Sequence, residues 1–465
     1  MRTACCVVAL GLLTVTCVFA QQPVTPAASL GMEITVYNSN MALVKDMRGL
    51  ILTKGFNNVQ FDDVAAQIDP TSVHFKSTTA PAAVTIREQN YQYDLVSRAK
   101  LLEKFLGKPI TIKQKNEGAA PTVITGTLMS ARDGLVIKTP DKLIICSPDS
   151  IELPSLPEGL IVKPTLNWLV DCAQAGRHST EVSYITNGIN WACDYVAVIN
   201  DKDTQGDLNG WVTVNNQSGA TYNNAKLKLI AGDVRRITPP RPMPAGRMAM
   251  GGAVMTMAAP QFEEKAFFEY HMYTLGRRTT VRDNETKQIE LLTAADIPLK
   301  KLYFFDGQRQ AKDEEGKAKA QVKIEFANSQ QNNLGMPLPK GKVRVYKADT
   351  DGSLQFVGED QIDHTPKDEK VRLYLGDAFD VVGQWAQTAR RKIADNVWET
   401  SVQIKLRNHK TEDISVTCTE HAGGDWTITN SSHQYTKKDA QTFEFTVPVK
   451  KDAETVVTYT VRVTS

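Results

Sequence analysis

The sequence has no excess of charge of either sign. In a chain of 465 residues, 54 lysines and arginines stand against 52 aspartates and glutamates. Proteins that bind nucleic acid or an anionic membrane surface need basic residues concentrated on one face. We therefore expect no nucleic-acid partner and no electrostatic attachment to lipid headgroups.

The short motifs of common enzyme classes are also missing. The chain contains no Gly-x-Ser-x-Gly elbow, no phosphate-binding Gly-x-x-x-x-Gly-Lys-Ser/Thr loop, no dinucleotide-binding Gly-x-Gly-x-x-Gly and no His-Glu-x-x-His zinc motif. We expect no cofactor, and the pattern favours a binding or structural protein over an enzyme. A carboxylate pair for glycoside hydrolysis is a tertiary property, so a hydrolase acting on polysaccharide or peptide stays open as an alternative.

Cysteine is scarce, and no Cys-x-x-Cys pair exists to support a redox or zinc-ribbon site. Three of the seven cysteines lie within the first 20 residues, and the others are Cys146, Cys172, Cys193 and Cys418. Cys172 and Cys193 flank two successive predicted strands, which makes them a candidate disulfide in an oxidising compartment. The alternative is that all four are buried thiols.

Residues 1–20 are typical of a secretion signal. Arg2 is followed by an uncharged, mostly apolar run, and Val18-Phe19-Ala20 offers the small residues that a signal peptidase recognises. Cys17 leaves a lipoprotein signal as an alternative to cleavage after Ala20. No later segment approaches the ~20 apolar residues of a membrane-spanning helix, so we expect a secreted or periplasmic protein without a transmembrane span.

The remaining chain is dominated by alternation of apolar and polar residues with a period of two. Clear examples are residues 371–375, 400–406, 443–449 and 457–463. This period is typical of antiparallel strands packed on one face. Asp351-Gly352 lies between two such runs and predicts a hairpin turn. The predicted fold class is mainly β, with antiparallel β-sandwich segments.

One segment departs from this pattern. Leu95, Ala99, Leu102 and Phe105 recur at helical spacing and predict a helix over residues 94–106, which Gly107 would cap. Several short strands follow closely, so we interpret residues 91–155 as a small inserted module of helix and strands. The predicted organisation is a signal peptide (1–20), an N-terminal β region (21–90), the module (91–155), a β domain (156–310) and a C-terminal β-sandwich (311–465).

Methionine is concentrated in a loop rich in proline and glycine at residues 237–262. Thioethers are soft ligands that suit Cu(I), so the metal candidates are Met243, Met248, Met250, Met255 and Met257. No histidine or cysteine lies in the loop to complete a familiar copper site. The alternative, which we favour, is a mobile loop whose methionines pack on an apolar groove or on another chain.

Weaker candidates lie near the C-terminus and in the acidic hairpin. His421 could join Asp425 at a loop tip, and Trp426 is the tryptophan that we expect to be exposed. Acidic residues gather around the Asp351-Gly352 turn, where oxygen-rich turns can hold Ca²⁺. Solvated hairpin ends explain the same pattern.

Several longer phrases point to a family. They are VSYITNGINW at residues 182–191, EYHMYTL at 269–275, LPKGKVRVY at 338–346 and LGDAFD at 375–380. Over residues 160–465 the chain resembles the bacterial domain-of-unknown-function family four-one-three-nine, whose relatives include the mucoidy inhibitor proteins. The resemblance implies export, β-sandwich segments and a role in the cell envelope, with an envelope protein or polysaccharide as partner. The long coiled-coil helices that usually precede this domain are absent from this sequence.

Overall fold

The structure is a computed structural model that describes residues 24–25, 29–116, 119–132, 134–157, 159–232, 234 and 261–464. The predicted signal peptide and residues 237–260 of the predicted loop lie outside these ranges. The predicted fold class is confirmed, because strands dominate the described residues and α1 is the one α-helix among them. None of the described helices is long and apolar enough to cross a membrane.

Contacts between residues divide the chain into two compact units. The described residues within Met1–Ile34, Leu43–Gly188 and Gln217–Ala225 belong to unit 1. Those within Thr35–Ala42, Ile189–Asn216 and Lys226–Ser465 belong to unit 2. Strands β1 (Gly31–Tyr37), β2 (Met41–Leu52) and β15 (Tyr222–Ala231) contribute residues to both units. The domain bounds proposed from the sequence stay a prediction.

Unit 1 contains a three-stranded antiparallel sheet with the order β3-β11-β5. Its strands are β3 (Gly55–Asp62), β11 (Thr165–Cys172) and β5 (Val84–Gln92). One face is apolar and buried: the rings of Phe61 and Trp168 lie 5.4 Å apart, and Trp168 is 2% exposed. Alternate residues point the other way, because successive side chains of a strand point to opposite faces of its sheet. In the same unit β12 (Gly176–Asn187) pairs with β4 (His74–Ser77).

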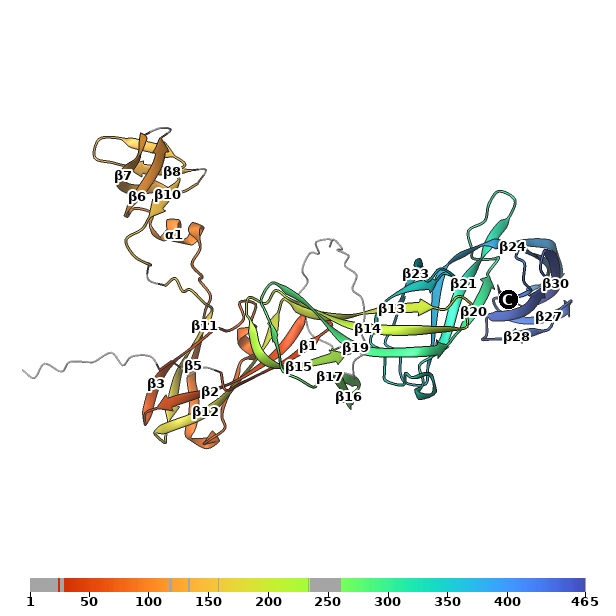
Figure 1. Ribbon diagram of the computed structural model, residues 1–465, viewed down its shortest axis with the longest axis horizontal. Helices are drawn as coiled ribbons and strands as arrows, with labels where there is room; N and C mark the ends of the chain where they lie inside the picture. The colour runs from red at the N-terminus through yellow and green to blue at the C-terminus, as the bar shows by residue number, and fades with distance from the viewer. Residues whose placement is uncertain are drawn as a thin grey trace, which may run out of the picture. The chain divides into compact units, whose positions relative to one another are not determined.

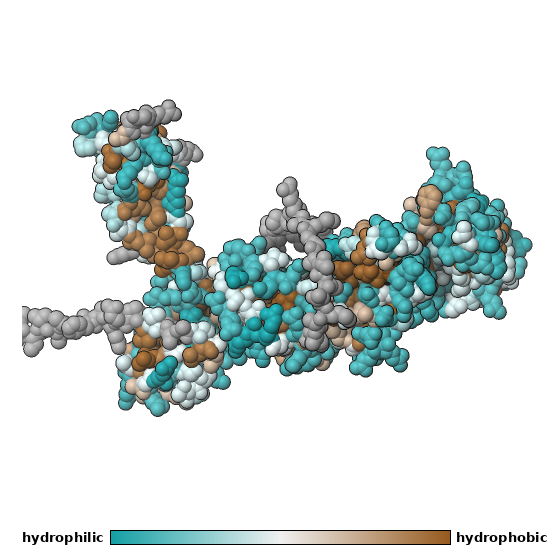
Figure 2. Space-filling model, in the orientation of Figure 1, coloured by the Kyte–Doolittle hydropathy of each residue, from teal (hydrophilic) through white to brown (hydrophobic). Residues whose placement is uncertain are grey.

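The inserted module also belongs to unit 1. Its sheet has the order β10-β6-β7-β8-β9, with β6 (Pro109–Asn116), β7 (Ala119–Ser130), β8 (Leu135–Lys138), β9 (Leu143–Cys146) and β10 (Ser150–Glu152). Leu102 and Phe105 pack with strand residues such as Ile110 and Ile137 to form its core. Strand β9 ends the sheet and leaves Leu143 63% exposed. Figure 2 shows brown, apolar residues on the surface of this module.

The predicted helix is present but shorter than expected. Helix α1 (Arg98–Lys104) begins after Ser97, whose backbone is still extended. The Ser97 side chain accepts a hydrogen bond from the Lys100 amide. A serine at this position satisfies one of the free amides at a helix start. The predicted cap at Gly107 is wrong, because the helix ends at Lys104 with Phe105 as its C-terminal cap. Gly107 has a positive φ of 76° and donates its amide hydrogen bond to the Leu128 carbonyl at 2.7 Å.

Unit 2 contains a five-stranded sheet with the order β19-β14-β13-β22-β23. Its strands are β13 (Ile189–Ile199), β14 (Gln205–Asn216), β19 (Glu285–Pro298), β22 (Gly341–Ala348) and β23 (Leu354–Ile362). Figure 1 shows β13, β14 and β19 running side by side, in agreement with their pairing. The predicted hairpin at Asp351-Gly352 is confirmed: it joins β22 to β23, and Gly352 has a φ of 83°. In this unit β16 (Phe262–Phe267) and β17 (Tyr270–Leu275) form a further hairpin, and β18 (Thr279–Val281) pairs with β15.

The C-terminal part of unit 2 is a nine-stranded sheet with the order β27-β30-β25-β24-β21-β20-β26-β29-β28. Its strands are β20 (Lys300–Phe305), β21 (Lys317–Ala327), β24 (Lys370–Ala394), β25 (Val397–Asn408), β26 (Ile414–His421), β27 (Asp425–Ser431), β28 (Tyr435–Lys437), β29 (Thr442–Val449) and β30 (Ala453–Thr464). Phe443 of β29 and Tyr459 of β30 have ring centroids 5.4 Å apart. Strands from opposite ends of the sheet therefore face each other across one core, as in a β-sandwich.

The candidate disulfide is absent. Cys172 and Cys193 are both free, buried thiols, and Cys146 and Cys418 are free as well. The physical reason is topological: Cys172 lies in β11 of the three-stranded sheet, whereas Cys193 lies in β13 of the five-stranded sheet. Strands β11, β12 and β13 follow one another in sequence, but each belongs to a different sheet.

Candidate functional site

A cavity of about 180 Å³ opens between the five-stranded and the nine-stranded sheets of unit 2. Both sheets contribute to its apolar walls, which are Ile199, Val322, Ile324, Val357 and Leu375. Its charged residues are Asp203, Lys301, Lys347 and Asp377. The alternating pattern of the strands predicts apolar residues on the inner faces, and charged residues are unusual there.

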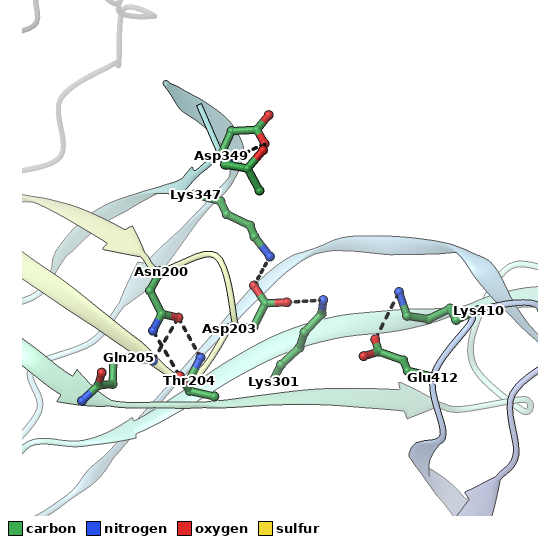
Figure 3. Close-up of polar contacts among 10 residues, drawn as sticks. Asn200, Asp203, Thr204, Gln205, Lys301, Lys347, Asp349, Lys410 and Glu412 are labelled. Carbon is green, nitrogen blue, oxygen red and sulfur yellow. Dashed lines mark hydrogen bonds and ion pairs between the residues drawn. The ribbon is translucent and has the colours of Figure 1, made fainter. Parts of the chain in front are cut away.

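Asp203 joins the two lysines of the cavity. Its carboxylate accepts hydrogen bonds from Lys301 Nζ at 2.7 Å and from Lys347 Nζ at 2.5 Å, as Figure 3 shows. Lys301 projects from β20 and Lys347 from β22, so the carboxylate links the two sheets.

The turn between β13 and β14 holds Asp203 in place. Asp203 has a positive φ of 56°, a conformation that aspartate and asparagine tolerate better than most residues. The Asn200 side chain fixes the turn by accepting a hydrogen bond from the Thr204 amide at 2.9 Å and donating one to the Thr204 hydroxyl at 3.1 Å (Figure 3). The carboxylate is therefore positioned by backbone geometry as well as by its lysine partners.

The pKa values of Asp203 and Lys301 are both shifted in the direction that favours the charged form. Burial acts to raise the pKa of Asp203, but hydrogen bonds from Lys301 and Lys347 and their positive charges outweigh burial and hold its pKa below the usual value. Burial acts to lower the pKa of Lys301, and its bond to Asp203 reverses the effect, so the pKa is raised. Two ammonium groups and one carboxylate leave a net charge of +1 in this cluster.

The cluster can bind an additional anion. Each ammonium has three donors, and the side chains of Lys301 and Lys347 remain 30% and 34% exposed. Asp377 lies on the same cavity and accepts a hydrogen bond from the Tyr374 hydroxyl at 2.9 Å. A cavity of about 150 Å³ with apolar walls can hold a benzene ring. The arrangement therefore suits a carboxylate attached to a small apolar group.

A second polar cluster surrounds Glu420 in the core of the nine-stranded sheet. Oε2 of this fully buried residue accepts hydrogen bonds from the Tyr459 hydroxyl, from Trp385 Nε1 at 3.0 Å and from Gln308 Nε2 at 3.2 Å. Oε1 has no hydrogen-bond partner among the described residues. Burial raises the pKa of Glu420 to about 7. The carboxyl group is closed off from solvent.

His421 lies beside this cluster, and the prediction that it joins Asp425 is wrong. Its Nε2 is 2.9 Å from an Asp306 carboxylate oxygen, instead of pairing with Asp425 at a loop tip. The reason is that β26 extends through His421, whereas Asp425 begins β27 and lies opposite Thr464.

The prediction that Trp426 is exposed is also wrong. Trp426 is 6% exposed, packs against Phe443 with a centroid distance of 5.0 Å, and donates from Nε1 to the Ala440 carbonyl at 2.6 Å. Strand β27 begins at Asp425, so Trp426 lies within the strand and its indole packs in the core of the nine-stranded sheet.

The candidate metal sites have no support in the described part of the chain. Met243, Met248, Met250, Met255 and Met257 lie outside the described residues, so the copper site stays a prediction. Within the described ranges no group of three histidine, cysteine, aspartate or glutamate side chains is placed to hold a metal ion. At the acidic hairpin, Asp349 and Asp351 instead accept hydrogen bonds from backbone amides of their own turn.

Sequence reasoning missed both polar clusters. Asp203 is 98 residues from Lys301 and 144 residues from Lys347 in sequence, and no local pattern marks the three residues as neighbours. Glu420 did have a local signal: Val416, Cys418 and Glu420 alternate on the buried side of β26. A carboxyl group in phase with an apolar strand face predicts a buried acid.

The chain matches no protein-family model, and no curated protein matches it. Its resemblance to the domain-of-unknown-function family therefore stays a prediction.

Proposed function

We propose that this protein is an exported β-sandwich binding protein whose cavity takes a carboxylate with a small apolar group. The N-terminal pattern of residues 1–20 supports export to the periplasm or the exterior. In that location the ligand would be a small apolar acid or the C-terminal residue of an envelope protein. No chemical step is required of the cavity.

The observation that carries the proposal is the convergence of Lys301 and Lys347 on a cavity with apolar walls. A cavity of this kind supplies both features that fix a small ligand: apolar surface for affinity and a few placed polar groups for orientation. Within the cluster of Asp203, Lys301 and Lys347 one ammonium charge is left over, and a ligand carboxylate competes for it with Asp377, the second carboxylate that lines the cavity.

Calorimetric titration with three small probes tests the proposal. Hexanoate should bind, hexanol should bind more weakly, and hexylamine should bind weakest, because the three share an apolar chain and differ in charge. Charge-assisted hydrogen bonds contribute about 1.5–3 kcal/mol each. The double variant Lys301→Gln/Lys347→Gln should therefore weaken hexanoate binding at least tenfold.

Lys342→Gln is the matched control. Lys342 lies on β22 like Lys347, but it pairs with Glu359 and does not line the cavity. Its substitution should leave the affinity for hexanoate unchanged. Equal binding of hexanoate and hexanol, or equal losses in the control and the double variant, would contradict the proposed site.

A further inference from the structure

We propose that the outer face of the three-stranded sheet in unit 1 binds a neutral oligosaccharide. The proposal concerns residues of unit 1 and is independent of the cavity in unit 2. It rests on a set of side chains that share one face of β3, β11 and β5. We call this set the amide face: Phe56, Asn58, Gln60, Glu88, Asn90, Gln92, Asn167, Leu169 and Asp171.

The register of the strands aligns the amides of this face in rows. Asn167 of β11 lies opposite Gln60 of β3 and opposite Asn90 of β5, which gives one row of three amides across the sheet. The next row places Leu169 between Asn58 and Glu88. Neighbouring strands are about 4.8 Å apart, so each row repeats polar groups at a spacing comparable to one sugar ring.

The face is open and slightly hollow. The other side of the sheet carries the core residues Val59, Phe61 and Trp168, so the amide face is the side that points to solvent. A depression of about 250 Å³ lies over Asn58, Glu88, Asn90, Asn167 and Leu169. A ligand can therefore reach the amides of Asn58, Asn90 and Asn167 without a change in the sheet.

The amides in the depression are not used inside the protein. Among the described residues, the side chains of Asn58, Asn90 and Asn167 make no hydrogen bond, whereas Gln60 donates to Asp62 at 3.0 Å. A carboxamide offers both donors and an acceptor, and a sugar hydroxyl also donates and accepts. Aligned, unpaired amides thus match a chain of hydroxyl groups better than they match an apolar or a purely ionic partner.

Charge and shape narrow the ligand to a neutral glycan. Glu88 is acidic, and Asp171 is paired with Arg87 at 2.8 Å, so the face offers no uncompensated positive charge to an acidic polymer. Phe56 is 59% exposed on the same face, and Leu169 forms an apolar floor between the amides. An exposed aromatic ring can stack on the apolar face of a pyranose, because its large flat surface buries apolar area at little entropic cost.

Affinity electrophoresis and calorimetry on the full chain without residues 1–20 test this proposal. The probes are the neutral hexasaccharides of glucose with α1–4 or β1–4 linkages, the hexamer of N-acetylglucosamine, and hexagalacturonate as the acidic comparison. We expect at least one neutral hexasaccharide to bind and hexagalacturonate to bind more weakly. Asn90→Ala/Asn167→Ala should weaken the neutral ligand about tenfold, because two hydrogen bonds of about 0.5–1.5 kcal/mol each are lost.

Two further variants keep the test decisive. Gln114→Ala removes an exposed amide from β6 of the module in the same unit and should leave binding unchanged. If the double alanine variant does not fold, Asn90→Asp, which keeps the size and removes two donors, should weaken binding by itself. Absence of binding to every neutral probe, preference for hexagalacturonate, or unchanged affinity in the Asn90 and Asn167 variants would overturn the proposal.

Discussion

The carboxyl group of Glu420 lies inside the core of the nine-stranded sheet, where burial raises its pKa from 4.5 to about 7. Hydrogen bonds from Tyr459, Trp385 and Gln308 favour the charged form and limit the rise, while the negative charge of Asp306 adds to it. A folded-state pKa above the unfolded value means that the folded protein holds a proton that the unfolded chain has released. The stability from this group is complete below pH ~4.5 and is lost as pH rises to about 7.

Glu420→Gln should remove this dependence on pH. The loss in the wild type amounts to about 3 kcal/mol at most, and glutamine keeps an oxygen that can accept from Tyr459 and Trp385. We expect the variant to match the wild type near pH 4.5 and to be more stable at pH 8, measured by urea unfolding at both values. Glu454→Gln, at a surface pair with Arg407, is the control. A difference between Glu420→Gln and wild type that is equal at the two pH values would refute the assignment.

At the scale of strands and turns, the sequence predicted those features that depend on residues close together in the chain. The Asp351-Gly352 hairpin was predictable because a turn with a positive φ selects glycine, and the helix was predictable from the spacing of Leu102 and Phe105. The helix start was not, because the hydrogen bond between Ser97 and the Lys100 amide competes with the apolar periodicity of residues 94–97. Trp426 was misplaced because its exposure depends on the partner strand, which its own neighbours do not identify.

The pairing of strands could not be predicted from the sequence, because the paired strands lie far apart in the chain. Strand β11 pairs with β3 and β5, more than 70 residues before it in sequence, and the module between β5 and β11 hides that relation. The cavity residues and the amide face follow from such pairings. A period of two tells which residues share a face of one strand, but not which strand lies beside it.

A close approach between β24 and β20 gives a prediction at this scale. A Cβ atom at Gly383 of β24 would lie 2.2 Å from a ring carbon of Phe305, which is fully buried. Gly383→Ala should therefore destabilise the protein by about 1–3 kcal/mol through overpacking, read from the urea midpoint. Gly423→Ala is the matched control, since nothing lies within 4 Å of a Cβ there. Equal midpoints for the two variants would show that the sheet relaxes around the added methyl group.

At the scale of the whole molecule, the described residues are held together by β-sheet cores and not by disulfide bonds. The four cysteines of the described residues are free, and three of them are buried. Burial raises the pKa of Cys193 to about 12, so its thiol is neutral and unreactive at neutral pH. The sequence predicted the mainly β class correctly because alternation runs through most of the chain, whereas it had no information on how two thiols from different sheets would be placed.

Reductant should leave the thermal stability of the chain lacking residues 1–20 unchanged. Removing a native disulfide typically costs about 2–5 kcal/mol, so dithiothreitol would lower Tm clearly if a bridge were present. A thiol reagent should label Cys146 first in the native protein and the three buried thiols after unfolding. A fall in Tm on reduction, or labelling of fewer than four thiols after unfolding without reductant, would indicate a bridge that the structure does not contain.

The short strand β9 has a consequence for crowded solutions of this protein. It closes one side of the module sheet with its backbone amides and carbonyls facing outward, and Ile145 beside Leu143 is 78% exposed. Such an edge is a template on which a strand from another molecule can grow. Its length of four residues and the neighbouring Lys142 work against that growth, since short strands and lysines are the means by which natural sheets avoid sticking to each other. We therefore expect the short edge strand β9 and Lys142 to limit edge-to-edge association of the module with other molecules.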